Sequence, residues 1–433
     1  MNLGALSLEN APGFWTPLRF FLTVPVFGVI AAVILFVDGG QLLQSRWQVA
    51  SLAVAHAFTL GYIASAMLGA LFQMLPVIMG AAFPQAERAS LLVHLLFTAG
   101  TLCLVFAFLT QQAALFTSAV TLLVPVLSLF GLGVLVAIQR AGKAGATAHA
   151  VQLSAFALIV SVAIGGYLGS GYAFEAVPLD RSVTNYHAVW GFVGWIFVLV
   201  IGVSGQVIPM FLATPPYPHG FNERLGYLLI LLLCIGSLMP LQGVKQACVV
   251  LVLVLMMAYA LVTLNLLQKR RRKRFDISNW FWQVGLLCLM LGAGITGYGY
   301  FYGTFAGKDV SMLSWLFLLA GFAVSLINGM LYKIVPFLVW LNLRMPVLKG
   351  ELKAGTRLYT PSIHEVIDVR PMKLQFLLHV AGLLLLVATL FREGLWVYAA
   401  ATAVLASNLL LLLNLLQAVR LYRKYSGQVM EVR

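Results

Sequence analysis

The chain has 433 residues, of which 61% are hydrophobic and 9% are charged, and its formal net charge is +14. Soluble globular proteins are about 45–50% apolar and about 25% charged. The composition therefore excludes a water-soluble globular fold and indicates that lipid is the solvent of this chain.

Apolar runs long enough to cross about 30 Å of hydrocarbon recur along the whole chain. The sequence predicts twelve membrane-spanning helices, near residues 14–37, 47–79, 88–110, 114–138, 151–173, 184–213, 224–243, 246–268, 280–303, 311–341, 373–391 and 394–420. We therefore expect a single all-α membrane domain over residues 1–433, with the lipid bilayer as its immediate partner.

The basic residues predict the orientation of these spans. The N-terminal segment, the even-numbered loops and the C-terminal segment hold 21 of the 27 Lys and Arg residues, the odd-numbered loops hold five, and Lys333 lies inside a span. Because cytoplasmic loops carry the excess of Lys and Arg, both termini are predicted to be cytoplasmic.

The run KRRRKR at residues 269–274 is, in isolation, typical of a nucleic-acid-binding patch. Between two membrane spans the same run indicates an anchor at anionic lipid headgroups. We expect no nucleic-acid partner.

Three of the predicted spans end in the same pattern. They read GALFQMLPVIMG, GVSGQVIPMFLA and GMLYKIVPFLVW, with the shared prolines at Pro76, Pro209 and Pro336. Three residues before each proline is a polar residue, seven before is a glycine, and fifteen before is another glycine; these are Gln73, Gln206 and Lys333, then Gly69, Gly202 and Gly329, then Gly61, Gly194 and Gly321. The recurrence predicts three pseudo-symmetric repeats of four helices, near residues 14–138, 151–268 and 280–420.

The polar residue before each proline also has a structural explanation. Proline leaves a carbonyl oxygen one turn earlier without its helical hydrogen bond, and a nearby amide or ammonium group satisfies that oxygen. The motif alone therefore supports a repeated architecture, but it does not indicate a chemical role for the polar residue.

Four histidines fall within predicted spans: His56, His94, His187 and His379. An ionisable residue in a span is costly and indicates a functional site, although a neutral imidazole that hydrogen-bonds a neighbouring helix is an equally simple explanation. His56 and His187 lie in the outer parts of two motif-bearing spans, but they are two positions out of register, about 200° around a helix. His94 and His379 occupy equivalent positions toward the cytoplasm and predict a weaker second site.

Twelve spans in three groups of four, cytoplasmic termini and the HAFTLG histidine ahead of GALFQMLP together resemble the catalytic subunit of haem–copper oxidases and nitric oxide reductases. The sequence is also similar to the nitric-oxide-response haem–copper membrane proteins. The resemblance implies that His56 and His187 bind haem b, copper or both, because imidazole is a common axial ligand of haem iron and also suits copper. It further implies the bacterial inner membrane, with respiratory-complex subunits or a cytochrome or quinol donor as partners.

The chain departs from that family where the oxygen-reducing centre is built. The tenth span of the oxidases supplies two histidines and the seventh supplies a pair to copper, whereas residues 311–341 and 224–243 contain none here. The His-Pro-Glu-x-Tyr sequence of the sixth span is replaced by NYHAVWGFVGW. We therefore expect a haem- or copper-binding protein of respiratory or nitric-oxide metabolism without a binuclear centre, more consistent with a relay, sensor or assembly factor than with an enzyme.

Two other interpretations remain open from the residues. In one, the protein is a metal-free transporter or channel in which Gln73, Gln206, Lys333 and Asn328 line a cytoplasmic half-pathway. In the other, it is an assembly partner of a larger respiratory complex.

Overall fold

The computed structural model describes residues 11–81, 83–142, 145–271, 275–305, 308–348, 361–392 and 394–430. Within these residues, twelve helices are long and apolar enough to cross a membrane, which confirms the predicted number of spans. The basic residues Lys143, Arg272–Arg274, Lys349, Lys353, Arg357 and Arg433 lie outside the described part.

Nine spans are single helices. They are α1 (Trp15–Asp38), α4 (Ala86–Thr110), α5 (Ala113–Ala141), α6 (Ala146–Ala173), α9 (Phe221–Leu238), α10 (Gln242–Gln268), α11 (Ile277–Tyr302), α14 (Val369–Phe391) and α15 (Trp396–Met430).

The other three spans are the motif helices, which change helix type along their length. The first joins α2 (Val49–His56), the π-helical segment η4 (Ala57–Ala64) and α3 (Ser65–Met79). The second joins the 3₁₀ turn η5 (Arg181–Val183), α7 (Thr184–Val189), the π-helical segment η6 (Trp190–Phe197) and α8 (Val198–Leu212). The third joins α12 (Val310–Trp315), the π-helical segment η7 (Leu316–Ala323) and α13 (Val324–Leu348).

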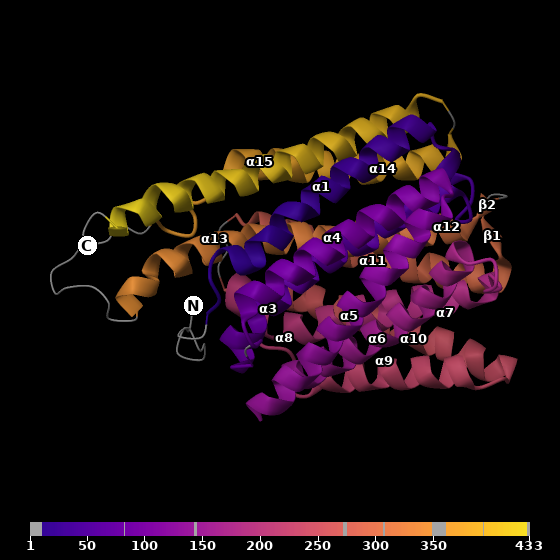
Figure 1. Cartoon of the computed structure of the whole chain (residues 1–433), viewed down its shortest axis with the longest axis horizontal. Coiled ribbons are helices and arrows are strands. Elements are labelled where there is room, and N and C mark those ends of the chain that lie inside the picture. The colour runs from indigo at the N-terminus through magenta and orange to yellow at the C-terminus, as the bar shows by residue number, and fades with distance from the viewer. Residues whose placement is uncertain are drawn as a thin grey trace.

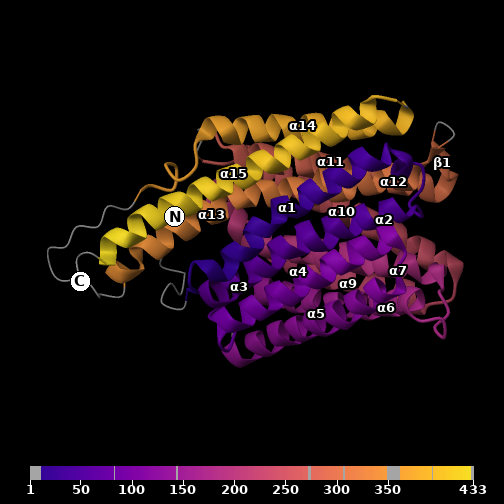
Figure 2. The same cartoon turned by 45° about the horizontal axis from the view of Figure 1, so that its top comes forward.

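The helices run side by side along one common direction, and the connections lie at the two ends of the bundle (Figures 1 and 2). A 3₁₀ turn, η3 (Gln41–Leu43), precedes the first motif helix, and a short antiparallel pair, β1 (Thr304–Phe305) and β2 (Lys308–Asp309), precedes the third. The first and last helices, α1 and α15, pack against each other. Phe14 stacks on Tyr422 with 3.7 Å between ring centroids, so the beginning of α1 and the C-terminal part of α15 lie at the same end of the bundle.

The outer helices present apolar side chains to their surroundings. Leu129 is 68% exposed, Leu377 is 61% exposed and Leu231 is 53% exposed, and each lies within a span. A bilayer interior accepts such surfaces and requires the backbone hydrogen bonds to close within each helix. The exposed leucines are therefore the lipid-facing surface of the bundle.

All three π-helical segments are eight residues long and each contains the glycine found fifteen residues before the proline. A π-helical segment fits extra residues into a helix and is found mainly at functional positions. The segments begin at corresponding places to within one residue, so the recurrence seen in the sequence extends to an uncommon backbone conformation.

The motif glycines set how closely each motif helix approaches the helix before it in the chain. A Cβ atom on Gly61, Gly194 or Gly321 would collide with Phe27 of α1, Ala157 of α6 or Cys288 of α11, respectively. A Cβ atom on Gly69, Gly202 or Gly329 would collide with Phe20, Ala150 or Phe281 in the same three helices. In α1, in α6 and in α11 the two contact residues are seven positions apart. The two glycines of each motif helix are eight positions apart, so both spacings are about two helical turns, as expected for neighbouring antiparallel helices.

We expect Gly202→Ala to destabilise the protein by about 1–3 kcal/mol. The added methyl group would collide with Cβ of Ala150, which cannot move unless the backbone of α6 moves with it. Gly294→Ala in α11 is the matched control, since a Cβ there meets nothing within 4 Å. Thermal unfolding in detergent should show a lower Tm for Gly202→Ala and an equal or higher Tm for Gly294→Ala, where alanine favours the helix. Equal Tm values for the two variants would contradict the close packing.

Candidate functional site

His56 and His187 come from different motif helices and face one internal cavity. Their imidazole rings are nearly parallel, with 18° between the planes and 6.3 Å between the centroids. His56 is the residue directly before η4, and His187 lies three residues before η6. The structure therefore brings together the two histidines that the sequence singled out.

His56 and His187 line the same cavity although they do not occupy equivalent positions in their motif helices. Each ring approaches the cavity from its own helix, and Ile196 and Leu316 are among the residues that line the same space from the second and third motif helices. An offset of two residues along the chain therefore leaves both rings directed at one space.

A backbone carbonyl fixes each imidazole. The Nδ1 atom of His56 lies 2.8 Å from the carbonyl oxygen of Leu52, and Nδ1 of His187 lies 3.0 Å from the carbonyl oxygen of Ser161. A carbonyl oxygen only accepts, so Nδ1 carries the proton in both rings and Nε2 keeps its lone pair. Among the described residues, neither Nε2 atom has a hydrogen-bond partner. This is the tautomer and anchoring that metal-binding histidines have.

The cavity between the histidines has a volume of about 400 Å³ and mainly apolar walls. Its walls come from all three motif helices and from α1, α4, α5 and α6; they include Leu35, Leu104, Phe108, Leu123, Val124, Leu158, Phe192, Trp195, Trp315 and Leu319. The ring of Phe108 stacks on His56 with 5.1 Å between centroids. The site is therefore a large apolar chamber that contains two nitrogen donors.

Glycines of α6 make room for this chamber. A Cβ atom on Gly165 would lie 2.7 Å from Cε1 of His187, and one on Gly166 would lie 2.8 Å from Val124 of α5. The glycine-rich run of residues 161–174 thus serves close helix packing, as small residues do in membranes, and it also seats the His187 ring.

Two arginines, Arg46 and Arg181, line the loop-side mouth of the cavity, and both lie near the ring of Trp47. The guanidinium carbon of Arg46 lies 4.4 Å from the Trp47 ring centroid and that of Arg181 lies 5.8 Å from it. Nη1 of Arg46 also donates a hydrogen bond to Asn185, at 2.9 Å. The two ion pairs found in the described part of the chain involve neither arginine.

Asp180, the acidic residue directly before Arg181, forms a hydrogen bond with Ser182 and no ion pair with either arginine. Its carboxylate accepts a hydrogen bond from the backbone N–H of Ser182, at 2.9 Å, and hydrogen bonds from Ser182 lower the pKa of this exposed carboxyl group. The mouth of the cavity thus combines two cations without a carboxylate partner.

His94 and His379 are engaged separately. Nε2 of His94 lies 2.8 Å from Oγ1 of Thr23 in α1, whereas Nε2 of His379 lies 2.7 Å from Oγ of Ser325 in α13. In each ring, Nε2 is already used in a hydrogen bond between helices. Their contacts therefore favour the structural explanation over a shared second site.

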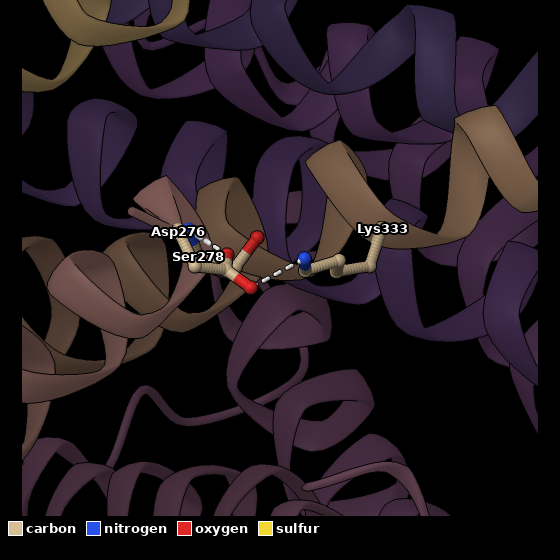
Figure 3. A network of polar contacts seen from close by, with 3 residues as sticks. All are labelled: Asp276, Ser278 and Lys333. Carbon is tan, nitrogen blue, oxygen red and sulfur yellow. Dashed lines mark hydrogen bonds and ion pairs between the residues drawn. The ribbon is translucent and has the colours of Figure 1, made fainter. Parts of the chain in front are cut away.

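The polar residues of the three motifs also differ in their partners. Nζ of Lys333 lies 2.7 Å from Oδ2 of Asp276, the residue that caps α11 and accepts a hydrogen bond from the backbone N–H of Ser278 (Figure 3). Gln73 is buried, and neither of its amide atoms has a partner among the described residues. Lys333 thus links its helix to the start of the preceding helix and does not bond the carbonyl freed by Pro336.

A buried polar network, which the sequence did not indicate, joins α13, α14 and α15. Tyr332 donates to Gln375 at 3.2 Å and accepts from Asn414 at 2.8 Å, and Gln375 donates to Ser407 at 3.0 Å. Tyr62 of the first motif helix donates to Asn328 of the third. Asn328 is thereby paired between two helices, as interhelical polar contacts in membranes usually are.

The described residues contain no group of three or more His, Cys, Asp and Glu side chains placed to hold a metal ion. All four cysteines are free thiols. The chain matches no model of a known protein family and no curated protein.

We expect Lys333→Gln to lower the unfolding free energy by about 1–3 kcal/mol, because it leaves the Asp276 carboxylate without its charged partner. The double variant Asp276→Asn/Lys333→Gln should recover most of the loss, since the other two motifs have glutamine at this position. Lys424→Gln, at an exposed position, is the control. The single variant Asp276→Asn completes the cycle. Thermal unfolding of the unmodified protein, the two single variants and the double variant measures the coupling, and additive effects of the two substitutions would contradict the ion pair.

Proposed function

We propose that the protein is a haem-binding integral membrane protein and that His56 and His187 hold one haem b between them. The observation that carries the proposal is the 6.3 Å separation of the two nearly parallel imidazole rings. Two imidazoles that bind one metal ion from opposite sides, with metal–nitrogen bonds of about 2.0–2.1 Å, have ring centroids roughly 6.4 Å apart.

The small number of protein ligands favours haem over a bare metal ion. A structural zinc site takes four protein ligands, and the described residues offer only two histidines at this place. Haem supplies four equatorial nitrogens of its own and needs only axial ligands from the protein. Copper held by the same two histidines is the second candidate, but two imidazoles alone do not account for a chamber of about 400 Å³.

The rest of the chamber also fits a haem. Apolar walls suit the faces of a porphyrin, and Arg46 and Arg181 suit its two propionates because guanidinium groups bind carboxylates in a fork geometry. No Cys-x-x-Cys-His sequence is present for covalent attachment. The residues therefore fit a non-covalent b-type haem, and Arg46 and Arg181 are the groups that would bind its propionates.

The protein's own residues then have defined roles. Nε2 of His56 and Nε2 of His187 would be the axial ligands, and the carbonyl oxygens of Leu52 and Ser161 hold both rings in the required tautomer. Bound haem would supply one-electron transfer. A haem held by these two histidines would suit an electron relay or redox sensor.

We place the chain as a divergent relative of haem–copper oxidase subunit I, in three repeats of four helices with both termini cytoplasmic. Three motif helices with matching prolines, glycines and π-helical segments support the repeat. The excess of basic residues at one end of the bundle supports the orientation. The setting is then a bacterial inner membrane, with a respiratory-complex subunit, a cytochrome or quinol as redox partner.

We expect the purified protein to show a Soret band and a pyridine haemochrome of haem b, both lost in His56→Ala and in His187→Ala. The near-parallel imidazole planes predict a rhombic low-spin ferric signal in electron paramagnetic resonance. His94→Ala is the control and should retain the spectrum, because its Nε2 atom serves Thr23. Colourless protein without iron or copper by elemental analysis would contradict this function and favour the transporter interpretation.

We expect Arg46→Gln and Arg181→Gln to lower the haem midpoint potential by tens of millivolts, because each removes a positive charge beside the site and so favours the oxidised, more positive form. The absorption spectrum should be unchanged, since neither arginine is an axial ligand. Arg423→Gln, at the other end of the bundle above Trp15, is the matched control. An unshifted midpoint potential in both Arg46→Gln and Arg181→Gln would contradict the assignment of these arginines to the haem propionates.

A further inference from the structure

A second, smaller cavity lies among the three motif helices, on the side of the histidine chamber nearer to the shared prolines. Its volume is about 100 Å³. Its walls come mainly from α3, α8 and α13. They include Ala66, Met67, Met74, Leu199, Val203, Val207, Ala323, Leu326 and Met330.

The walls of this cavity offer almost no hydrogen bonding. Its polar residue, Ser204, already donates to the carbonyl of Ile201 at 2.9 Å and accepts from Tyr259 at 3.0 Å. Nε1 of Trp282 is buried and has no hydrogen-bond partner among the described residues, and a single donor is too few to hold a water. A buried water needs two to four polar partners, so this cavity does not suit water.

We propose that the cavity is a binding site for an apolar gas molecule, of the class of dioxygen, nitric oxide or xenon. Dry apolar cavities of about 150 Å³ in proteins bind xenon or benzene, and this one is smaller and suits the smaller ligands. The thioethers of Met67, Met74 and Met330 add polarizable surface, which strengthens dispersion contacts.

The spacing of the methionines argues against a copper site here. Met67 and Met74 are seven residues apart in one helix, about 10.5 Å along its axis. Two thioethers so placed do not meet at one ion with short bonds.

The gas site adjoins the histidine chamber through one side chain. Ile196 lines both cavities, and neighbouring residues of the same helices divide between them: Ala320 faces the chamber and Ala323 faces the gas site. Small apolar molecules dissolve in the bilayer, and Ile196 separates such a molecule from the two imidazoles. The site itself does not depend on haem being bound in the chamber.

The test is xenon pressurisation of crystals of the protein, with xenon located by its anomalous scattering. We expect a xenon peak between α3, α8 and α13 in the unmodified protein, and its loss in Ala323→Leu, which fills the cavity. Ala399→Leu at an exposed position of α15 should keep the peak. Ala66→Val, a smaller filling substitution, serves if Ala323→Leu fails to fold, and should reduce xenon occupancy severalfold.

Absence of xenon between these helices in the unmodified protein, an ordered water in its place, or an unchanged peak in a well-folded filled variant would each overturn the proposal. The double variant His56→Ala/His187→Ala separates the two proposals. It should lose any haem spectrum and keep the xenon peak, whereas haem binding can fail in the unmodified protein without affecting the gas site.

Discussion

The architecture depends on the approach of each motif helix to the helix that precedes it. In a bilayer the hydrophobic effect does not drive helices together, so close contact must come from van der Waals packing of small residues. Two glycines in each motif helix allow that contact, and in all three cases the positions on the preceding helix are seven residues apart. The remaining faces of the motif helices then turn toward one another and enclose both cavities.

The sequence was sufficient for the features that follow from chemistry along the chain. Span number follows from apolar length, and all twelve predicted spans are present in the described structure, with ends that differ by a few residues. The positions of the motif glycines were also informative, since they coincide with the close contacts between helices. The π-helical segments were not predictable, because the extra residue in each turn is stabilised by contacts between helices rather than by a local sequence preference.

From the sequence, only the two candidate ligands of the site, His56 and His187, could be predicted. Intramembrane histidines stand out in a sequence, but their convergence depends on how three helices pack, and an offset of two residues pointed against it. Arg46 and Arg181 appeared only as two of the few basic residues in odd-numbered loops, although Arg46 precedes the first motif helix, Arg181 begins the second, and both line the cavity. The carbonyls of Leu52 and Ser161 carry no side-chain signal at all. The sequence therefore does not show which backbone carbonyls will bind Nδ1 of each histidine and so fix its tautomer.

The same comparison separates the histidines by chemistry. His94 and His379 occupy equivalent positions and use Nε2 to bind a hydroxyl, so they stabilise helix contacts. His56 and His187 are not equivalent, and both instead use Nδ1 on a carbonyl, which leaves Nε2 directed at a chamber much larger than an imidazole needs. Contacts between helices therefore account for His94 and His379, and His56 and His187 are the pair available for a ligand. A protein that kept only packing constraints would have no reason to leave two imidazole nitrogens without hydrogen-bond partners beside one internal cavity, where each costs free energy.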